Sequence, residues 1–135
     1  MIVRHALVAD PLVLQAGAPV REVAAVLTKP NVVQVLVVDD DRLVGSVTEE
    51  AVVAAVAEGL DLRELTAGDL ADPDVPTVGP DTPLDEAILL MGETSLERMA
   101  VVEDGRLLGI LPREPVVRRL AEEEPPPLDA DQQQV

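Results

Sequence analysis

Apolar residues follow two different patterns along the first half of the chain, one typical of helices and one typical of strands. Val20, Val23, Ala24 and Leu27 follow at i, i+3, i+4 and i+7, which is the apolar face of a helix. Short aliphatic runs at Leu12–Leu14 and Val32–Val38, and the stretch Arg42–Val47, have strand length instead. A further helix is predicted over Glu49–Glu58. The pattern therefore predicts strand, helix, strand, strand, helix.

The same order of elements returns at a constant offset of 64 residues. Leu12–Val56 aligns with Pro76–Leu120 without a gap, and eleven of the 45 paired positions are identical. Leu84, Ala87, Ile88 and Met91 repeat the helix face, and further elements are predicted over Leu96–Val102, Arg106–Leu111 and Arg113–Glu122. A constant register without insertions indicates two copies of one supersecondary unit.

Two copies of about 60 residues each would be marginal as separate domains, because so short a chain buries only about 60% of its surface. We therefore predict an α/β (α+β) fold in which two β-α-β-β-α copies pack about an approximate two-fold axis. The first copy is assigned residues 1–61 and the second copy residues 62–121. Residues 122–135 are acidic and rich in proline and glutamine, so a disordered tail is expected there.

Turn and cap residues support these boundaries. Pro19 suits the first position of a helix, and Thr82 is expected to be the N-cap of the corresponding helix in the second copy. Asp39-Asp40-Asp41 and Glu103-Asp104-Gly105 are expected to form hairpin turns, the second with an Asp-Gly pair.

Composition narrows the function classes. The net charge of −16 and the absence of aromatic residues argue against binding to nucleic acid or to anionic membranes. With no cysteine and one histidine, His5, the chain has no set of residues typical of a metal site. No segment has the features of a signal peptide or a membrane span, so a cytoplasmic protein is expected. No constellation of catalytic residues is recognisable, and we expect no enzyme activity.

Several motifs resemble those of a tandem CBS domain pair, also called a Bateman module. They are Pro83-Leu84-Asp85-Glu86-Ala87, Val37-Val38-Asp39, Leu43-Val44-Gly45-Ser46-Val47-Thr48 and Leu107-Leu108-Gly109-Ile110-Leu111. The resemblance covers about residues 3–121. It implies the fold predicted above and a regulatory role, because such modules mostly sense adenosine-containing ligands (AMP, ATP or S-adenosylmethionine), although many have no known ligand.

The family's nucleotide signature, G-h-h-T-x-x-D (h is an apolar residue), is kept only in part. Gly45 and Thr48 match it in the first copy, but Ala51 stands in place of the aspartate, where Glu50 could substitute with its longer side chain. Thr48 also has a simpler interpretation as the N-cap of the following helix. In the second copy Pro112 and Pro115 replace both polar residues.

The resemblance places a ligand in the cleft between the copies. The residues that we predict to bind it are Val13, Val35, Thr48, Glu50, Thr77, Val78, Met99 and Arg113. Arg113 would meet a phosphate, or it could simply be solvated. Because the chain is so acidic, adenosine, AMP or S-adenosylmethionine is favoured over ATP. The side that carries Thr48 is expected to dominate, because Pro112 and Pro115 degrade the other side.

Two hypotheses follow. The chain is a regulatory module that senses an adenosyl ligand, or it is an interaction or scaffolding module without a small ligand. In either case the last helix of each copy has an apolar stripe, formed by Val52, Val53 and Val56 in the first copy and by Val116, Val117 and Leu120 in the second. A stripe of this kind must be buried, and we expect a homodimer through these helices.

Overall fold

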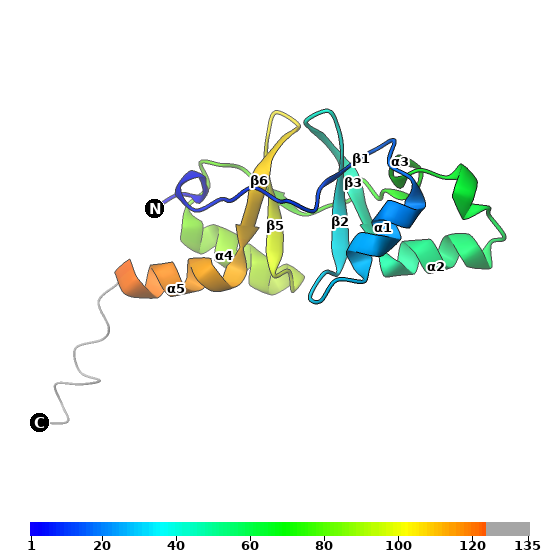
Figure 1. Cartoon of the computed structure of the whole chain (residues 1–135). Helices are drawn as coiled ribbons and strands as arrows, with labels where there is room; N and C mark the ends of the chain where they lie inside the picture. Colours follow the sequence, from blue (N-terminus) through cyan, green and yellow to red (C-terminus); the bar gives the residue numbers. More distant parts are fainter. Residues whose placement is uncertain (124–135) are drawn as a thin grey trace, which may run out of the picture.

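The computed structural model describes residues 1–123, and Figure 1 shows how their helices and strands are arranged. The elements are η1 (Val3–His5), β1 (Leu14–Gln15), α1 (Val20–Leu27), β2 (Gln34–Asp39), β3 (Arg42–Thr48), α2 (Glu49–Ala57), η2 (Leu62–Glu64), α3 (Ala67–Leu70), β4 (Thr77–Val78), α4 (Leu84–Thr94), β5 (Arg98–Glu103), β6 (Arg106–Pro112) and α5 (Arg113–Glu123). The predicted order of elements is confirmed for both copies.

The strands form one sheet in the order β1-β2-β3-β6-β5-β4, so the two copies meet edge to edge in its middle. In each copy a parallel short strand and an antiparallel hairpin pair in the same register, with a bulge at Val37 in the first copy and at Val101 in the second. Only one rung, Arg42 opposite Arg106, joins β3 to β6. All six pairs of each hairpin, and one of the two pairs of each parallel contact, repeat at the offset of 64, as expected for an approximate two-fold axis.

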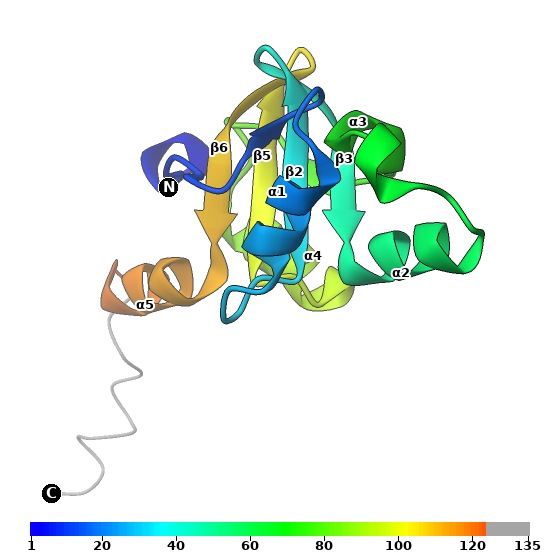
Figure 2. The same ribbon diagram turned by 45° about the vertical axis from the view of Figure 1, so that its right-hand side comes forward.

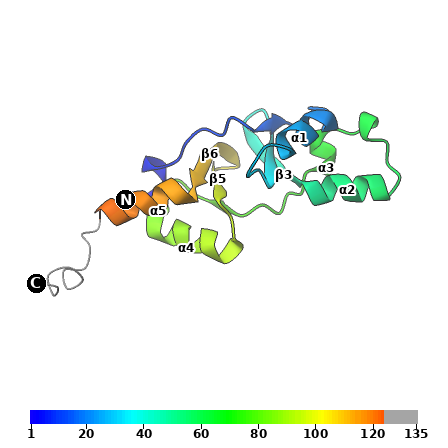
Figure 3. The ribbon, with the colours of Figure 1, turned by 60° about the horizontal axis from the view of Figure 1, so that its bottom comes forward.

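The hairpin tips carry this single rung, and the helices follow at the opposite end of the strands. Figure 2 shows β3 and β6 running away from the tips and into α2 and α5. Both turns have two residues, and Asp40, Asp104 and Gly105 adopt positive φ angles of 58°, 52° and 82°. Figure 3 shows α4 and α5 at one end of the molecule and α1 and α2 at the other. The two copies therefore meet through their sheets, with the helices outside.

Several element boundaries differ from the prediction. The first strand is Leu14–Gln15 rather than Leu12–Leu14, because the preceding residues turn at Asp10, whose carboxylate accepts a hydrogen bond from the Leu12 N–H. Pro19 and Pro83 are N-cap residues and not the first residues of their helices. Thr82 is therefore not the N-cap of α4, and its carbonyl instead accepts a hydrogen bond from the Val3 N–H at 2.9 Å.

At the C-terminus, Glu122 and Glu123 belong to α5 and not to a tail. The remainder of the predicted tail, residues 124–135, lies outside the described residues. Within residues 1–123, no helix combines the length and the apolar character that crossing a lipid bilayer requires.

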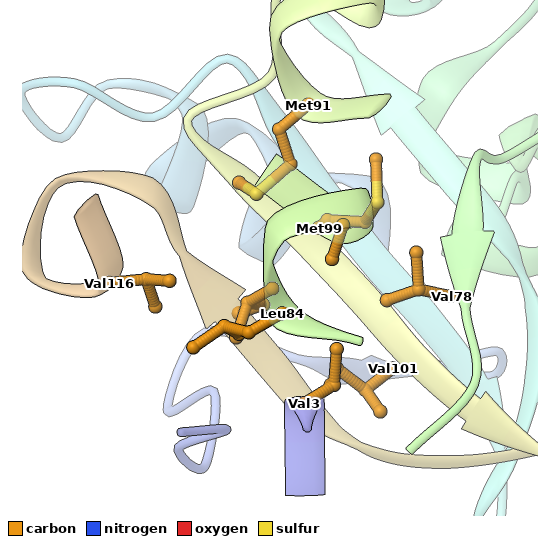
Figure 4. Close-up of a cluster of buried hydrophobic side chains, with 9 residues drawn as sticks. Val3, Val78, Leu84, Met91, Met99, Val101 and Val116 are labelled. Carbon is orange, nitrogen blue, oxygen red and sulfur yellow. The ribbon is translucent and has the colours of Figure 1, made fainter. Parts of the chain in front are cut away.

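Each copy has its own hydrophobic core between its sheet and its helices. The core of the second copy, drawn in Figure 4, consists of Val3, Val78, Leu84, Ala87, Met91, Met99, Val101, Leu111 and Val116. The core of the first copy consists of Val23, Val26, Val35, Val37, Val47 and Ala67. In both sets one residue comes from the other half of the sequence, Val3 in the second copy and Ala67 in the first.

These two residues belong to segments that the copies exchange. The N-terminal segment, residues 1–8, packs on the second copy, and the connecting segment, residues 65–72, packs on the first copy. Figure 1 shows the blue N-terminal chain starting beside α5 and crossing to β1 near α1. Each copy thus depends on a segment that precedes the first strand of the other copy.

The hydrogen bonds of the two exchanged segments match one another at the offset of 64. Val8 gives and accepts one backbone hydrogen bond with Ile110, at 2.9 and 2.8 Å, and Asp72 does the same with Ser46, at 2.8 and 3.0 Å. The strand glycines explain this close approach. A Cβ on Gly45 would lie 2.3 Å from the Asp72 carbonyl oxygen, and a Cβ on Gly109 would lie 2.5 Å from that of Val8. Both motif glycines are therefore required by the exchange itself.

Candidate functional site

The surface between the copies is formed by the sheet faces that carry no helices. Because side chains alternate along a strand, the register partners Leu36 and Ser46, and likewise Ala100 and Ile110, point to one face. Leu36, Ala100 and Ile110 are buried together in a central cluster, against which Val13, Leu43, Val75, Val102 and Leu107 pack. This central cluster packs aliphatic side chains of both copies against one another.

A cavity remains beside the axis, at the end of the strands away from the hairpin tips. It encloses about 40 Å³ and takes side chains from both copies. The lining residues are Asp10, Leu12, Asn31, Val32, Val33, Gln34, Leu36, Leu96, Glu97, Arg98 and Ile110. We call it the axial cavity. Gln34 and Arg98, which correspond at the offset of 64, begin β2 and β5 on either side of it.

The structure does not bring all of the predicted cleft residues together. Val35 lies in the core of the first copy, whereas Val78 and Met99 lie in the core of the second, so these three point toward the helices and away from the axis. Thr77 is exposed in β4. Only Val13 packs on the central cluster between the copies. A ligand bound on this inter-copy face would therefore not contact Val35, Thr77, Val78 or Met99.

Thr48 is the N-cap of α2, as its simpler interpretation required. Its hydroxyl accepts a hydrogen bond from the Ala51 N–H at 3.2 Å. It is the register partner of Gln34, so it begins α2 near the axial cavity without lining it. Glu50 lies in the first turn of α2 and is exposed, and no ion pair within the described residues holds it toward the cavity. The binding roles of both residues stay predictions.

Arg113 begins α5 in the corresponding position of the second copy. Its backbone N–H donates to the Glu97 carbonyl at 2.8 Å, which consumes one donor of the helix N-terminus. Pro115 offers no N–H, so this end of α5 has few donors left for a phosphate. The axial cavity takes residues from both copies, Ile110 of β6 among them. Neither Thr48 nor Arg113 lines it.

Five polar residues of the axial cavity were missed in the sequence: Asp10, Asn31, Gln34, Glu97 and Arg98. Asp10 precedes the first strand, and Gln34 and Arg98 each begin a strand. Arg98 forms no ion pair with a carboxylate among residues 1–123, although two acids, Asp10 and Glu97, also line the cavity. The signal was the pairing of two polar residues, Gln34 with Arg98, within otherwise aliphatic strands at the same position of both copies.

Comparison with known proteins identifies the repeated unit. A model of the CBS domain matches the chain twice, over residues 3–58 and 67–122. Hypoxic response protein 1 of Mycobacterium tuberculosis is 35% identical over 85 residues, which are 62% of this chain and 59% of that protein. The chain thus spans less than two thirds of the length of this curated relative.

Solved structures agree over nearly the whole described fold. CBSX2 in complex with AMP has a TM-score of 0.71 and 27% identity, with coverage of 90% of this chain and 97% of that one. The CBS domain pair of protein MJ0100, in complex with 5′-methylthioadenosine and S-adenosyl-L-methionine, has a TM-score of 0.65 and 25% identity, with coverage of 92% and 98%.

Proposed function

Because the chain belongs to the CBS domain family and carries two copies of that domain, we propose that it is a regulatory module that senses an adenosyl ligand. The ligand occupies the axial cavity, which at about 40 Å³ has to widen to admit it. One observation carries this proposal: the cavity is built by the same strand starts of both copies, so its occupant touches both of them. A ligand held in this way stabilises one relative arrangement of the copies, which is what a partner would detect.

Two structural relatives at 25% and 27% identity support the ligand class, since they were solved with AMP and with S-adenosyl-L-methionine and 5′-methylthioadenosine. The charges that line the cavity narrow this ligand class further. Asp10 and Glu97 outnumber Arg98, so the three phosphates of ATP would meet one cation and two anions. Adenosine, AMP and S-adenosylmethionine are therefore expected to bind more tightly than ATP.

Calorimetric and thermal-shift titrations with adenosine, AMP, ATP and S-adenosylmethionine test the proposal. A ligand at 100 times its dissociation constant raises the free energy of unfolding by about 2.7 kcal/mol. Arg98→Gln should weaken the binding of AMP more than the binding of adenosine, because only AMP carries the phosphate that a guanidinium binds. Arg118→Gln is the matched control, since Arg118 pairs with Glu114 on the exposed side of α5. A flat response to all four compounds contradicts the proposal.

A second function is favoured by the packing between the copies. The central cluster buries aliphatic side chains of both copies against one another, and the Thr48 hydroxyl is engaged as a cap. These features suit an interaction module that works without a small ligand. Its docking surface would be the apolar stripes of the last helices, where Val53, Val56 and Val117 are 59%, 57% and 40% exposed.

A homodimer through α2 and α5 is part of both proposals. Light scattering at micromolar concentration should give twice the chain mass of 14.3 kDa. Val53→Asp would place a charge in the apolar contact and should return the mass to that of one chain. Val33→Asp is the control, since Val33 is 69% exposed but lies on a loop and belongs to neither apolar stripe. A mass of one chain for the unchanged protein contradicts the homodimer.

A further inference from the structure

Residues 9–13, which we call the strap, cross from one copy to the other. Val8, just before the strap, is bonded in both directions to Ile110 of the second copy, and Leu14, just after it, pairs with Val37 of the first copy. Between these anchors, the Leu12 N–H donates to the Asp10 carboxylate at 2.9 Å. Within the described residues, no backbone hydrogen bond ties the strap to either copy. The strap is therefore hydrogen-bonded only at its ends, while along its length Leu12 packs against the core of the first copy and Val13 against the central cluster.

The strap separates two cavities. Asp10 and Leu12 line the axial cavity, whereas Ala9 and Val13, together with Asp10, line a second cavity of about 260 Å³. The other residues around this second cavity are Gln15, Val38, Asp40, Asp41, Leu107, Leu108 and Gly109. Leu12 of the strap thus faces the axial cavity, Ala9 and Val13 face the second cavity, and Asp10 borders both.

The axial cavity is much smaller than the second cavity, and it is too small to admit a ligand as it stands. The axial cavity, at about 40 Å³, has room for a few water molecules and none for an adenosyl group. Pockets that hold small organic ligands enclose about 300–1,000 Å³. The second cavity, at about 260 Å³, would supply most of the missing space if the strap moved into it.

We propose that the strap is the lid of the axial cavity, and that it opens by moving toward the second cavity. The motion needs no hydrogen bond between the copies to break, since both anchors lie outside residues 9–13. It enlarges the axial cavity at the expense of the second one. The inference rests on the proposed function for the identity of the ligand, but the motion itself can be measured without a ligand.

Thiol labelling measures the motion, because the chain has no cysteine of its own. Leu36 is 4% exposed and lines the axial cavity, whereas its neighbour Val37 is 0% exposed and lies in the core of the first copy. The variants Leu36→Cys and Val37→Cys are treated separately with dithionitrobenzoate. Cysteine at position 36 should react at least about tenfold faster than cysteine at 37, which reacts only when the protein unfolds globally.

Filling the second cavity should hold the lid shut. Leu108, 38% exposed, lines that cavity, so Leu108→Trp in the Leu36→Cys background should slow labelling about tenfold. Leu89→Trp is the control, because Leu89 is exposed on α4 and lines neither cavity. Pro11→Gly frees the backbone of the strap and should accelerate labelling, which keeps the test decisive if Leu108→Trp folds poorly.

The lid is contradicted if cysteines at 36 and 37 react at one rate, or if neither strap variant changes the rate at position 36. The same assay separates this outcome from failure of the proposed function. Saturating S-adenosylmethionine, AMP or adenosine should protect the cysteine at 36 when a ligand sits in the axial cavity. Fast labelling that Leu108→Trp slows, without protection by any of the three compounds, supports the lid and contradicts the adenosyl ligand.

Discussion

The cores of the two copies fill one backbone frame with different side chains. Val35 and Val47 in the first copy correspond to Met99 and Leu111 in the second, while Val23 corresponds to the smaller Ala87. Volume added by the larger residues is partly returned by the smaller one, which is how cores tolerate substitution. The comparison teaches that the frame is set by the pattern of apolar positions and by the exchanged segments, rather than by particular core residues.

Substitutions at paired core positions should reveal the largest difference in stability between the two copies. Leu111→Ala is expected to lower the free energy of unfolding by about 2–5 kcal/mol. Val47→Ala should cost roughly two thirds as much, because two carbons are lost instead of three at positions that are both 0% exposed. Urea unfolding followed by circular dichroism measures both.

Both variants should keep a single unfolding transition, since each core contains a residue supplied by the other copy's segment. Two separate transitions would contradict the view that the copies form one cooperative unit.

The strand glycines should show the copies to be equivalent. Gly45→Ala and Gly109→Ala each force a Cβ against a backbone carbonyl of an exchanged segment, and each should cost about 1–3 kcal/mol. Gly92→Ala in α4 is the control, because no heavy atom lies within 4 Å of its Cβ position. That change should stabilise the protein by up to about 1 kcal/mol. A tolerated alanine at position 45 or 109 would show that the segment can move away.

The helix caps should show the smallest difference. Thr48→Ala removes the acceptor of the Ala51 N–H and should cost about 1 kcal/mol, while Thr48→Ser should cost less because it keeps the hydroxyl. Pro112→Thr, at the matching position of the second copy, tests whether α5 gains from a cap. Thermal unfolding reports all three. If Thr48→Ala also weakens the binding of an adenosyl compound while Thr48→Ser preserves it, the hydroxyl has a binding role in addition to its role as a cap.

The repeat and the period of apolar residues sufficed to predict the element order, the pairing of the hairpins and the approximate two-fold axis. The exchange of segments could not be predicted from them. From the sequence alone, Val3 could complete the core of either copy. The apolar pattern therefore does not show that it belongs to the core of the second copy. The close approach at Gly45 and Gly109 was the available signal, and it was attributed to a nucleotide motif instead.

Val35 and Met99, two of the residues predicted for the cleft, each lie one position before the strand residue that faces the other copy. Val35, Leu36, Val37 and Val38 are all buried, because the helices cover one face of the sheet and the other copy covers the opposite face. Such a run has no alternation from which the face could be assigned. Leu36 and Ala100 therefore lie between the copies, where Val35 and Met99 were expected. The polar pair Gln34 and Arg98 would have given the correct face.

The exchanged segments have a consequence for the single repeat. A peptide limited to residues 1–61 would lack Ala67, which completes its core, and would carry a Val3 with no second copy to receive it. Two such peptides could complete each other's cores by exchanging their N-terminal segments, but the resulting dimer would form only at sufficient concentration. Joining the repeats in one chain replaces that encounter by an effective concentration of about millimolar or above. The duplication thus turns an association between molecules into a folding step within one.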